Sequence, residues 1–560
     1  MFHLLSVLLL TLLASTEALT SNKIDLERIG VASTAHPLAT QAADDMYRLG
    51  GNSVDAAIAA SFVLSVVEPT MSGLGGRALA IIRSEEGNFY GYNGMTEIPK
   101  SFVKSADMPA FGYSTVATPG LVAMLGAMHQ KHGSLPFAEL VKPAIRQAEG
   151  GFAVLPGEAA RQNSKIQQIT LDVGMTKSFL QSDGTTFEAG QILKQPALAM
   201  TLRQIAQEGS DAFYRGEIAR LISEDMASNG GYITSQDLED YRVLPGRYIS
   251  IPYRDHIVHT LAAPGGGGLV AKALMLLDLY DLSNLQDQHW ALLVSQALGI
   301  SIESMTDNYY EKDLIKLVDK QWAIQQSKRI YLPAPEQATK ISKQVLRKPN
   351  LTDWVGYAGA HTSHLVTEDC SGLTVSMTQT LGPIFGAKVA TPKLGFTYAA
   401  TMGGYLRTGP QEPGARPRTA IAPVIVTKDS KVVLALGSAG GIKIPSAIVQ
   451  VVSRYIDQKK TLADSLSAPR VHPSAIIDNN NKRVVRLMAF DAEMSNPGWT
   501  GDDLSFWRST GFEVTEVTTA ASFGRVHLIA NDQGRLLGAA DPDWEGTASP
   551  QAVCPRISNN

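Results

Sequence analysis

The spacing of hydrophobic and polar residues predicts a helix-rich first part of the chain. Residues 35–67 fit two helices separated by a glycine pair, and Asn52 or Ser53 can cap the second one. This second helix is almost wholly apolar, so we expect it to be buried. Residues 190–240 are amphipathic at helical spacing, and residues 290–345 are helix-rich and charged.

After residue 361 the alternation typical of strands becomes the dominant pattern. Residues 364–367 and 373–380 flank a turn and predict a hairpin with two different faces. Further strands are expected at 421–426 and 432–436 and within 484–538, and an apolar helix at 445–455. The main change of pattern therefore falls near residue 361.

Three glycine-rich loops are candidates for binding. The loop at 72–76 leads into a strand and lacks the Walker pattern, which argues against a phosphate cradle. The loop at 264–268 is better explained as a flexible strand-to-helix connection than as a nucleotide site. The loop at 437–441 precedes an apolar helix. It is either a plain turn, or a place where the N–H groups of Gly440 and Gly441 point at a developing oxyanion.

Length and composition describe a large globular protein. The chain has 560 residues, of which 44% are hydrophobic, and length alone suggests three or four domains. The net charge of −4 comes from acids and bases mixed along the chain, so we expect no nucleic-acid partner. No HExxH or EF-hand pattern is present, and we expect neither a metal nor another cofactor.

The N-terminus predicts export. Residues 4–14 are almost wholly apolar but too short to span a bilayer comfortably. This segment fits a secretory signal at residues 1–19, with cleavage near Ala18, although the usual positive charges are missing. The alternative is a single N-terminal membrane anchor. We expect a secreted or periplasmic protein without a stable membrane span.

Two cysteines, Cys370 and Cys554, exclude a disulfide scaffold and a CxxC metal site. They form one bridge in an oxidising compartment or remain two free thiols.

The bond between His361 and Thr362 is a candidate cleavage site. If the backbone breaks there, the Thr362 hydroxyl becomes a nucleophile and its new α-amine becomes the base. Such an amine has a pKa of about 7.7–8.0, so part of it is unprotonated near neutral pH. Residues 345–361 resemble an exposed linker, as a cleavable junction requires. Taken alone, Thr-Ser-His indicates no more than a strand segment with hydroxyl groups.

A series of short motifs gives this site its context. In chain order they are Gly51–Ala60, Val67–Pro69, Ser72–Gly76, Pro119-Gly120, His132-Gly133, Pro143–Ile145, Ala148–Gly150, Thr362, Thr380 and Gly440-Gly441. In this order they resemble the γ-glutamyltranspeptidase family of N-terminal-nucleophile hydrolases, from about Ile29 to Asp543.

The resemblance implies an α+β fold, a four-layer αββα sandwich made as a self-cutting precursor. Residues 20–361 would form the large subunit and residues 362–560 the small subunit, as one composite fold. It also implies roles for four residues. Thr362 is the nucleophile, Thr380 supplies a hydroxyl that contacts it, and Gly440 and Gly441 form the oxyanion hole.

The positions that hold a γ-glutamyl group in the family differ here. Met95 replaces an arginine that binds the α-carboxylate, and Thr419-Ala420 replaces a serine pair. Gly404, in a run that includes Thr401, replaces an acidic residue, and Gly382 replaces an asparagine. A desolvated zwitterion needs an opposing charge at each end, and methionine cannot mimic a bidentate arginine. We therefore expect a roomier, more apolar pocket.

Several arginines are candidates for a substitute anchor, although each is also explained as a structural or surface residue. The first is Arg77, which ends the glycine loop, and the others are Arg407, Arg416 and Arg418.

These observations predict a self-processing amide hydrolase or acyltransferase that acts on a small-molecule amide or peptide with a non-γ-glutamyl acyl group. One alternative is a genuine γ-glutamyl hydrolase or transpeptidase for glutathione-type substrates that uses other head-group residues. The other is an inactive scaffold or binding protein, which predicts an uncut chain.

Overall fold

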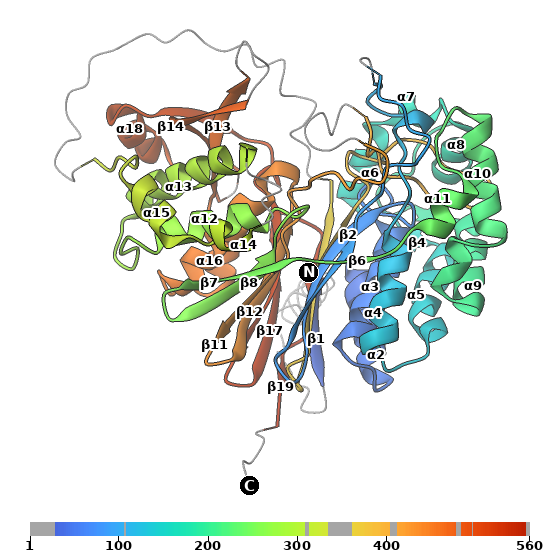
Figure 1. Ribbon diagram of the computed structural model, residues 1–560, viewed down its shortest axis with the longest axis horizontal. Helices are drawn as coiled ribbons and strands as arrows, with labels where there is room; N and C mark the ends of the chain where they lie inside the picture. The colour runs from blue at the N-terminus through green and yellow to red at the C-terminus, as the bar shows by residue number, and fades with distance from the viewer. Residues whose placement is uncertain are drawn as a thin grey trace, which may run out of the picture.

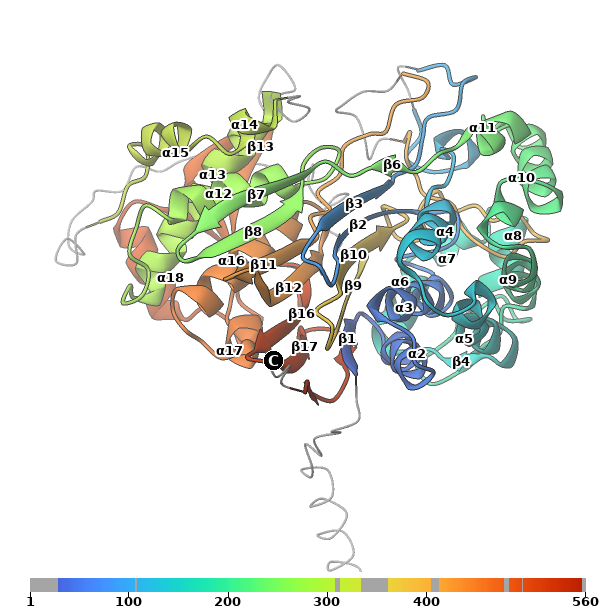
Figure 2. The same cartoon turned by 60° about the horizontal axis from the view of Figure 1, so that its bottom comes forward.

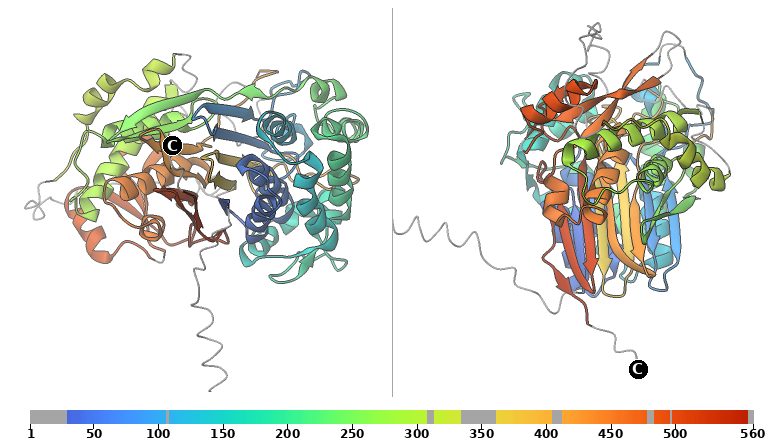
Figure 3. Two further views of the ribbon diagram at one scale, coloured as in Figure 1. Left: turned by 90° about the horizontal axis from the view of Figure 1, so that it is seen from below. Right: turned by 90° about the vertical axis from the view of Figure 1, so that its left-hand side faces the viewer.

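The computed structural model describes residues 29–105, 108–307, 313–333, 361–403, 412–477, 483–495 and 497–555. Two seven-stranded sheets lie face to face, and helices cover the outer face of each (Figure 1). The four layers are also visible when the molecule is viewed from below (Figure 3, left). The expected α+β sandwich of type αββα is confirmed. The predicted signal at residues 1–19 lies outside the described residues, as does most of the linker expected at 345–361.

The first sheet combines segments from both sides of residue 361. In spatial order its strands are β18 (Thr547–Ala548), β1 (Gly30–Thr34), β9 (Ser363–Asp369), β10 (Thr374–Thr380), β2 (Arg77–Arg83), β3 (Phe89–Gly94) and β6 (Leu244–Pro245). The predicted hairpin is β9–β10, and it lies between β1 and β2. The sheet is therefore complete only when both parts of the chain are present.

The second sheet has the same mixed origin. Its strands, in spatial order, are β19 (Ala552–Val553), β17 (Arg535–Ala540), β16 (Arg525–Asp532), β12 (Lys431–Ala439), β11 (Val424–Lys428), β8 (His256–Leu261) and β7 (Tyr248–Tyr253). Strand β11 begins later than the predicted residue 421. Pro423, which has no N–H to give to a strand ladder, directly precedes it.

Helices from the first part of the chain cover the first sheet (Figure 2). They are α2 (Pro37–Arg48), α3 (Ser53–Val67), α4 (Leu121–His132), α5 (Phe137–Gly150), α6 (Pro156–Asn163), α7 (Ile166–Ile169), α8 (Val173–Phe179), α9 (Pro196–Glu208), α10 (Glu217–Ser228) and α11 (Ser235–Asp240). Shorter elements here are η2 (Tyr113–Thr115), η3 (Ser210–Phe213), β4 (Phe152–Ala153) and β5 (Ile192–Leu193). Helix α3 is buried along its whole length, as its apolar sequence predicted. Asn52, one of the two predicted caps, forms a capping box with Asp55.

The outer face of the second sheet is covered by helices from both parts. These are α12 (Gly267–Leu277), α13 (Asp287–Asp307), α14 (Leu314–Leu317), α15 (Lys320–Ser327), η6 (Gly441–Lys443), α16 (Ile444–Ile456) and α17 (Leu462–Ser467). Beside them lie a small sheet, β13 (Val471–Ile477), β14 (Arg483–Glu493) and β15 (Glu513–Val517), and helix α18 (Gly501–Ser509). Helix α18 lies within a stretch for which the sequence pattern predicted strands.

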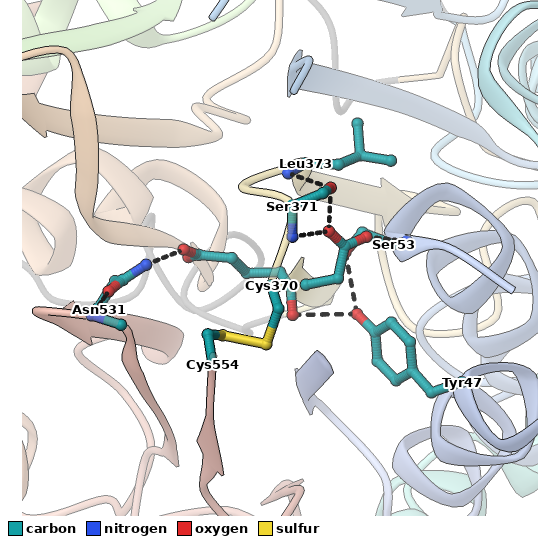
Figure 4. Close-up of a disulfide and its surroundings, with 10 residues drawn as sticks. Tyr47, Ser53, Cys370, Ser371, Leu373, Asn531 and Cys554 are labelled. Carbon is teal, nitrogen blue, oxygen red and sulfur yellow. Dashed lines mark hydrogen bonds between the residues drawn. A yellow bond between two sulfur atoms is a disulfide. The ribbon is translucent and has the colours of Figure 1, made fainter. Parts of the chain in front are cut away.

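The two cysteines form a disulfide, with their Cα atoms 5.1 Å apart. Cys370 follows β9 and Cys554 follows β19, so the bond joins the two sheets at the end of β9 away from Thr362 (Figure 4). Both cysteines follow residue 362 in the chain. Among the described residues, no helix combines the length and apolar character that a membrane crossing requires.

Candidate active site

The hydroxyl of Thr380 joins the predicted nucleophile to the predicted cleavage site. The Thr362 Oγ1 donates to Thr380 Oγ1 at 3.2 Å, and Thr380 Oγ1 donates to the carbonyl oxygen of His361 at 2.5 Å. The backbone N–H of Gly382 donates to the same Thr380 oxygen at 2.9 Å. Thr380 thus receives two hydrogen bonds and has one proton to give, which it gives to the carbonyl.

This arrangement suits addition of a hydroxyl to the His361 carbonyl. A donor on a carbonyl oxygen stabilises the negative charge that develops when a nucleophile adds. Strands β9 and β10 fix the geometry, because Ser363 pairs with Gln379 and brings Thr362 beside Thr380. Thr362 is only 5% exposed.

Gly440 and Gly441 lie at the same end of the sandwich as Thr362. Strand β12 packs across the hairpin there. Ser376 Oγ donates to the Leu436 carbonyl at 2.9 Å, and a Cβ on Gly437 would meet the ring of His364 at 2.2 Å. The end of β12 therefore reaches the level of Thr380, and Gly440 and Gly441 follow it.

The backbone at these two glycines requires glycine. Gly440 and Gly441 have φ values of +147° and +56°, and they lead through η6 into the start of α16. A Cβ on Gly440 would lie 2.7 Å from the Cα of Gly524. N–H groups before a helix start are suited to bind a negative charge.

A buried carboxyl, Glu68, lies behind Thr362 on the other face of β9. Ser363 Oγ donates to Glu68 Oε2 at 2.5 Å, and Ser72 Oγ lies 3.0 Å from the same serine hydroxyl. Burial raises the pKa of Glu68 to about 7, although Arg161, the Ser363 hydroxyl and Arg525 oppose this rise. Glu68 belongs to the motif Val67–Pro69, but no role was predicted for it. The signal that could have indicated one is an acidic residue directly after an almost wholly apolar helix.

The histidines of the site are neutral near pH 7. Burial, followed by the charges of nearby arginines and lysines, lowers the pKa of His361 to about 3. Burial also lowers the pKa of His364 well below its usual value, and its Nδ1 lies 2.7 Å from Thr378 Oγ1. Neither ring is poised as a general base at neutral pH.

The stretches predicted to bind the acyl group are neighbours in space. Thr401 Oγ1 lies 2.8 Å from Thr96 Oγ1, so residues 94–99 and 399–403 are in contact. Met95 is fully buried in the core between the sheets, and its carbonyl accepts a hydrogen bond from Tyr241 at 2.7 Å.

The predicted serine-pair position lies on another loop. The N–H of Thr419 donates to the Pro264 carbonyl at 2.8 Å, and a Cβ on Gly266 would lie 2.6 Å from the Ala420 carbonyl oxygen. Gly404 lies outside the described residues, as does Arg407.

Of the candidate arginines that the structure describes, Arg77 is the one that pairs with a predicted catalytic residue. It begins β2 directly opposite Thr380, so both side chains lie on the same face of the sheet. Arg77 is fully buried. Arg416 is held by Glu97, with two contacts to Glu97 Oε2 at 3.0 and 3.2 Å, and Arg418 is half-buried. These contacts give Arg416 a structural role.

Two surface pockets of about 430 Å³ each lie elsewhere, and none of the predicted site residues lines them. Within the described ranges, no three His, Cys, Asp or Glu side chains converge as metal ligands would.

Known proteins match this chain over most of its length. The model of the family described as "Gamma-glutamyltranspeptidase" matches residues 39–551. A glutathione hydrolase proenzyme of Pseudomonas sp. (strain A14) is 28% identical over 555 residues, covering 92% of each chain. An acylase ACY 1 proenzyme of Pseudomonas sp. (strain V22) is 30% identical over 472 residues, covering 79% of this chain and 82% of the acylase.

The fold also matches solved structures. The crystal structure of the cephalosporin acylase from Bacillus halodurans superposes with a TM-score of 0.81 at 26% identity. The match covers 95% of this chain and 97% of the acylase.

Proposed function

The chain belongs to the γ-glutamyltranspeptidase family of N-terminal-nucleophile hydrolases and transferases, and from this premise we propose that Thr362 is its self-generated nucleophile. The observation that carries the proposal is the Thr380 hydroxyl, which contacts both the Thr362 hydroxyl and the His361 carbonyl. The Thr380 side chain thus contacts both the proposed nucleophile and the carbonyl of the bond to be cut.

Self-cleavage follows from this contact in two steps. The Thr362 oxygen adds to the His361 carbonyl carbon while Thr380 donates to the carbonyl oxygen. The C–N bond then breaks, which leaves His361 esterified to the Thr362 oxygen and frees the Thr362 amine, whose nitrogen takes up the proton that the hydroxyl has lost. Water hydrolyses the ester, releasing the His361 carboxylate and the threonine hydroxyl. The products are the proposed large subunit, residues 20–361, and the small subunit, residues 362–560.

Turnover uses the same hydroxyl together with the new amine. The amine takes the hydroxyl proton as the oxygen attacks the substrate amide, and it then gives that proton to the leaving amine. The N–H groups of Gly440 and Gly441 bind the oxyanion, and loss of one such donor typically costs about 2.7–4 kcal/mol of barrier. Water or a second amine then takes the acyl group from Thr362.

We propose an acyl group without the γ-glutamyl head. Met95, at the position of the family's carboxylate-binding arginine, is packed in the core between the sheets and offers no charge. The acylases among the relatives support this class of substrate. A butyryl anilide, which lacks both the α-amino and the α-carboxylate group, should release aniline faster than the matching γ-glutamyl anilide.

A genuine γ-glutamyl enzyme for glutathione-type substrates is the second candidate. It is supported by the glutathione hydrolase relatives and by Arg77, whose position opposite Thr380 suits an anchor for a carboxylate. Rapid release from the γ-glutamyl anilide would favour this candidate over the first.

We also propose that the protein is exported to the periplasm or secreted. The disulfide between Cys370 and Cys554 supports this, because such bonds persist mainly in oxidising compartments. Fractionation of cells that express the full chain tests it.

Intact mass of the purified protein tests the nucleophile. The parent should give two fragments that divide between His361 and Thr362, and Thr362→Ala should give one chain. A single uncut parent would instead support the inactive scaffold.

A further inference from the structure

The residue directly after the proposed nucleophile is anchored by a buried network that contains both proposed subunits. Ser363 and Trp544 follow the cleavage site, whereas Glu68 and Ser72 precede it. Ser363 Oγ donates to one oxygen of the Glu68 carboxyl at 2.5 Å, and Trp544 Nε1 donates to the other at 3.4 Å. Glu68 is 1% exposed, so these contacts are shielded from water.

Two arginines flank the indole that holds Glu68. The Arg525 guanidinium lies 3.5 Å from the centre of the Trp544 ring, and that of Arg161 lies 4.3 Å from it. Arg161 also binds Glu158 at 2.9 Å. The charged groups around Glu68 include Arg161, Arg525 and Glu158.

This network gains importance once the backbone is cut. Thr362 then keeps a single covalent link, its peptide bond to Ser363. A chain end is poorly ordered unless neighbouring contacts hold it. The Ser363 side chain points away from the Thr362 side chain, because successive residues of a strand face opposite sides of the sheet. A hydrogen bond on Ser363 can therefore hold the strand end without blocking the nucleophile.

We propose that Glu68 is a positioning residue that orients the N-terminal Thr362 through Ser363 and places a negative charge behind its amine. The proposal rests on Thr362 being the nucleophile. It assigns two separable effects: the Ser363 hydroxyl fixes the direction of attack, and the Glu68 charge favours the protonated form of the Thr362 amine.

Three variants separate these effects. Ser363→Ala removes the hydrogen bond. Glu68→Gln keeps an acceptor for Ser363 and removes the charge. Glu368→Gln is the matched control, because Glu368 is also buried and its pKa is also raised to about 7, but it lies near the other end of β9.

The readout is acylation of the cut protein by p-nitrophenyl acetate across pH, with Thr362→Ala as the background. This ester is small and activated, so it reports the nucleophile rather than substrate recognition. Ser363→Ala should lower the limiting rate by about 10- to 100-fold, the scale expected of a displaced reacting group. Glu68→Gln should move the midpoint of the acid limb to lower pH by roughly 0.5–1 unit, because a nearby carboxylate stabilises an ammonium.

Glu368→Gln should change neither quantity. If Ser363→Ala and Glu68→Gln have the same rate and midpoint as Glu368→Gln, the positioning proposal is wrong. Activity of the parent would in that case still support Thr362 as the nucleophile. An uncut, unreactive parent would contradict the proposed function itself. If Glu68→Gln does not fold, Ser363→Ala is the deciding variant, because it removes only one oxygen atom. A rate equal to that of the parent would overturn the proposal, and a lowered rate would support it.

Discussion

The two ends of strand β9 are built from similar parts but held in different ways. At the beginning of the strand, Ser363 binds the buried carboxyl of Glu68. At its other end the carboxyl of Glu368 binds Asn531 at 2.7 Å, beside the disulfide of Cys370 (Figure 4). Burial raises the pKa of both glutamates to about 7.

The difference lies in what surrounds each carboxyl. The Cys370 end is tied covalently, and Glu368 there is next to a structural turn. The Thr362 end has no such bond. Its carboxyl, Glu68, binds Ser363, the neighbour of Thr362, whose hydroxyl contacts Thr380. A raised carboxyl pKa therefore does not by itself indicate a functional residue. What distinguishes the two glutamates is how close each carboxyl lies to a reactive group.

The largest effect should come from the hydroxyl at the Thr362 end. Thr362→Ala should abolish both self-cleavage and turnover, whereas Thr362→Ser keeps a hydroxyl and should still cut. Intact mass and amide release measure the two activities. Cleavage of Thr362→Ala would assign the cut to another residue.

Loss of the shared donor should come next. Thr380→Val keeps the side-chain shape and removes the proton given to the His361 carbonyl, so self-cleavage should slow by about 10²–10³-fold. The time course of fragment formation on denaturing gels measures this. Thr374→Val, at the other end of β10, is the control and should cut at the parental rate.

Breaking the covalent tie should destabilise the other end without touching the chemistry. The double variant Cys370→Ser with Cys554→Ser should lose about 2–4 kcal/mol of stability and keep its rate of self-cleavage. Denaturant unfolding and gel time courses measure the two. Because both cysteines follow residue 362, the fragments of the parent should separate on a denaturing gel without reductant. Fragments that separate only after reduction would contradict the pairing.

The smallest effect concerns stability against pH. A carboxyl with a raised pKa binds its proton more tightly when folded, so its contribution to stability is complete below about pH 4.5 and is lost as pH rises through about 7. Glu368→Gln should remove this decline.

Buried histidines have the opposite effect on the free energy of unfolding over part of the same pH interval. The pKa of His361 and of His527 is lowered to about 3, so their contribution to stability rises with pH. The measured quantity is therefore the difference in unfolding free energy between Glu368→Gln and the parent at each pH. A constant difference across the interval would contradict the assignment.

Local patterns were enough to predict individual elements. Alternating residues gave the hairpin that became β9 and β10, and the apolar run before Glu68 gave a buried helix. Helix α18 was missed, because Phe506 and Trp507 favour strands. The sequence did contain a signal for it, since Thr500 forms a capping box with Asp503.

Contacts between distant residues were beyond such patterns. The sequence order of motifs, through the family resemblance, placed Thr362 and Thr380 together. Nothing local relates Ser363 to Glu68, which lie 295 positions apart. Met95 shows the same limit, because its substitution was visible in the sequence but its place in the core between the sheets was not.

The two ends of the described chain lie close together near the disulfide, so the protein is suited to circular permutation. The N–H of Cys370 donates to the carbonyl of Ile29 at 2.8 Å, and Cys370 is bonded to Cys554. A short linker from Pro555 to Ile29 would therefore join neighbouring points. A circular permutant that starts at Thr362, once its initiator methionine is removed, would carry the free amine from synthesis. Such a protein would allow turnover to be studied in a chain that never had to cut itself.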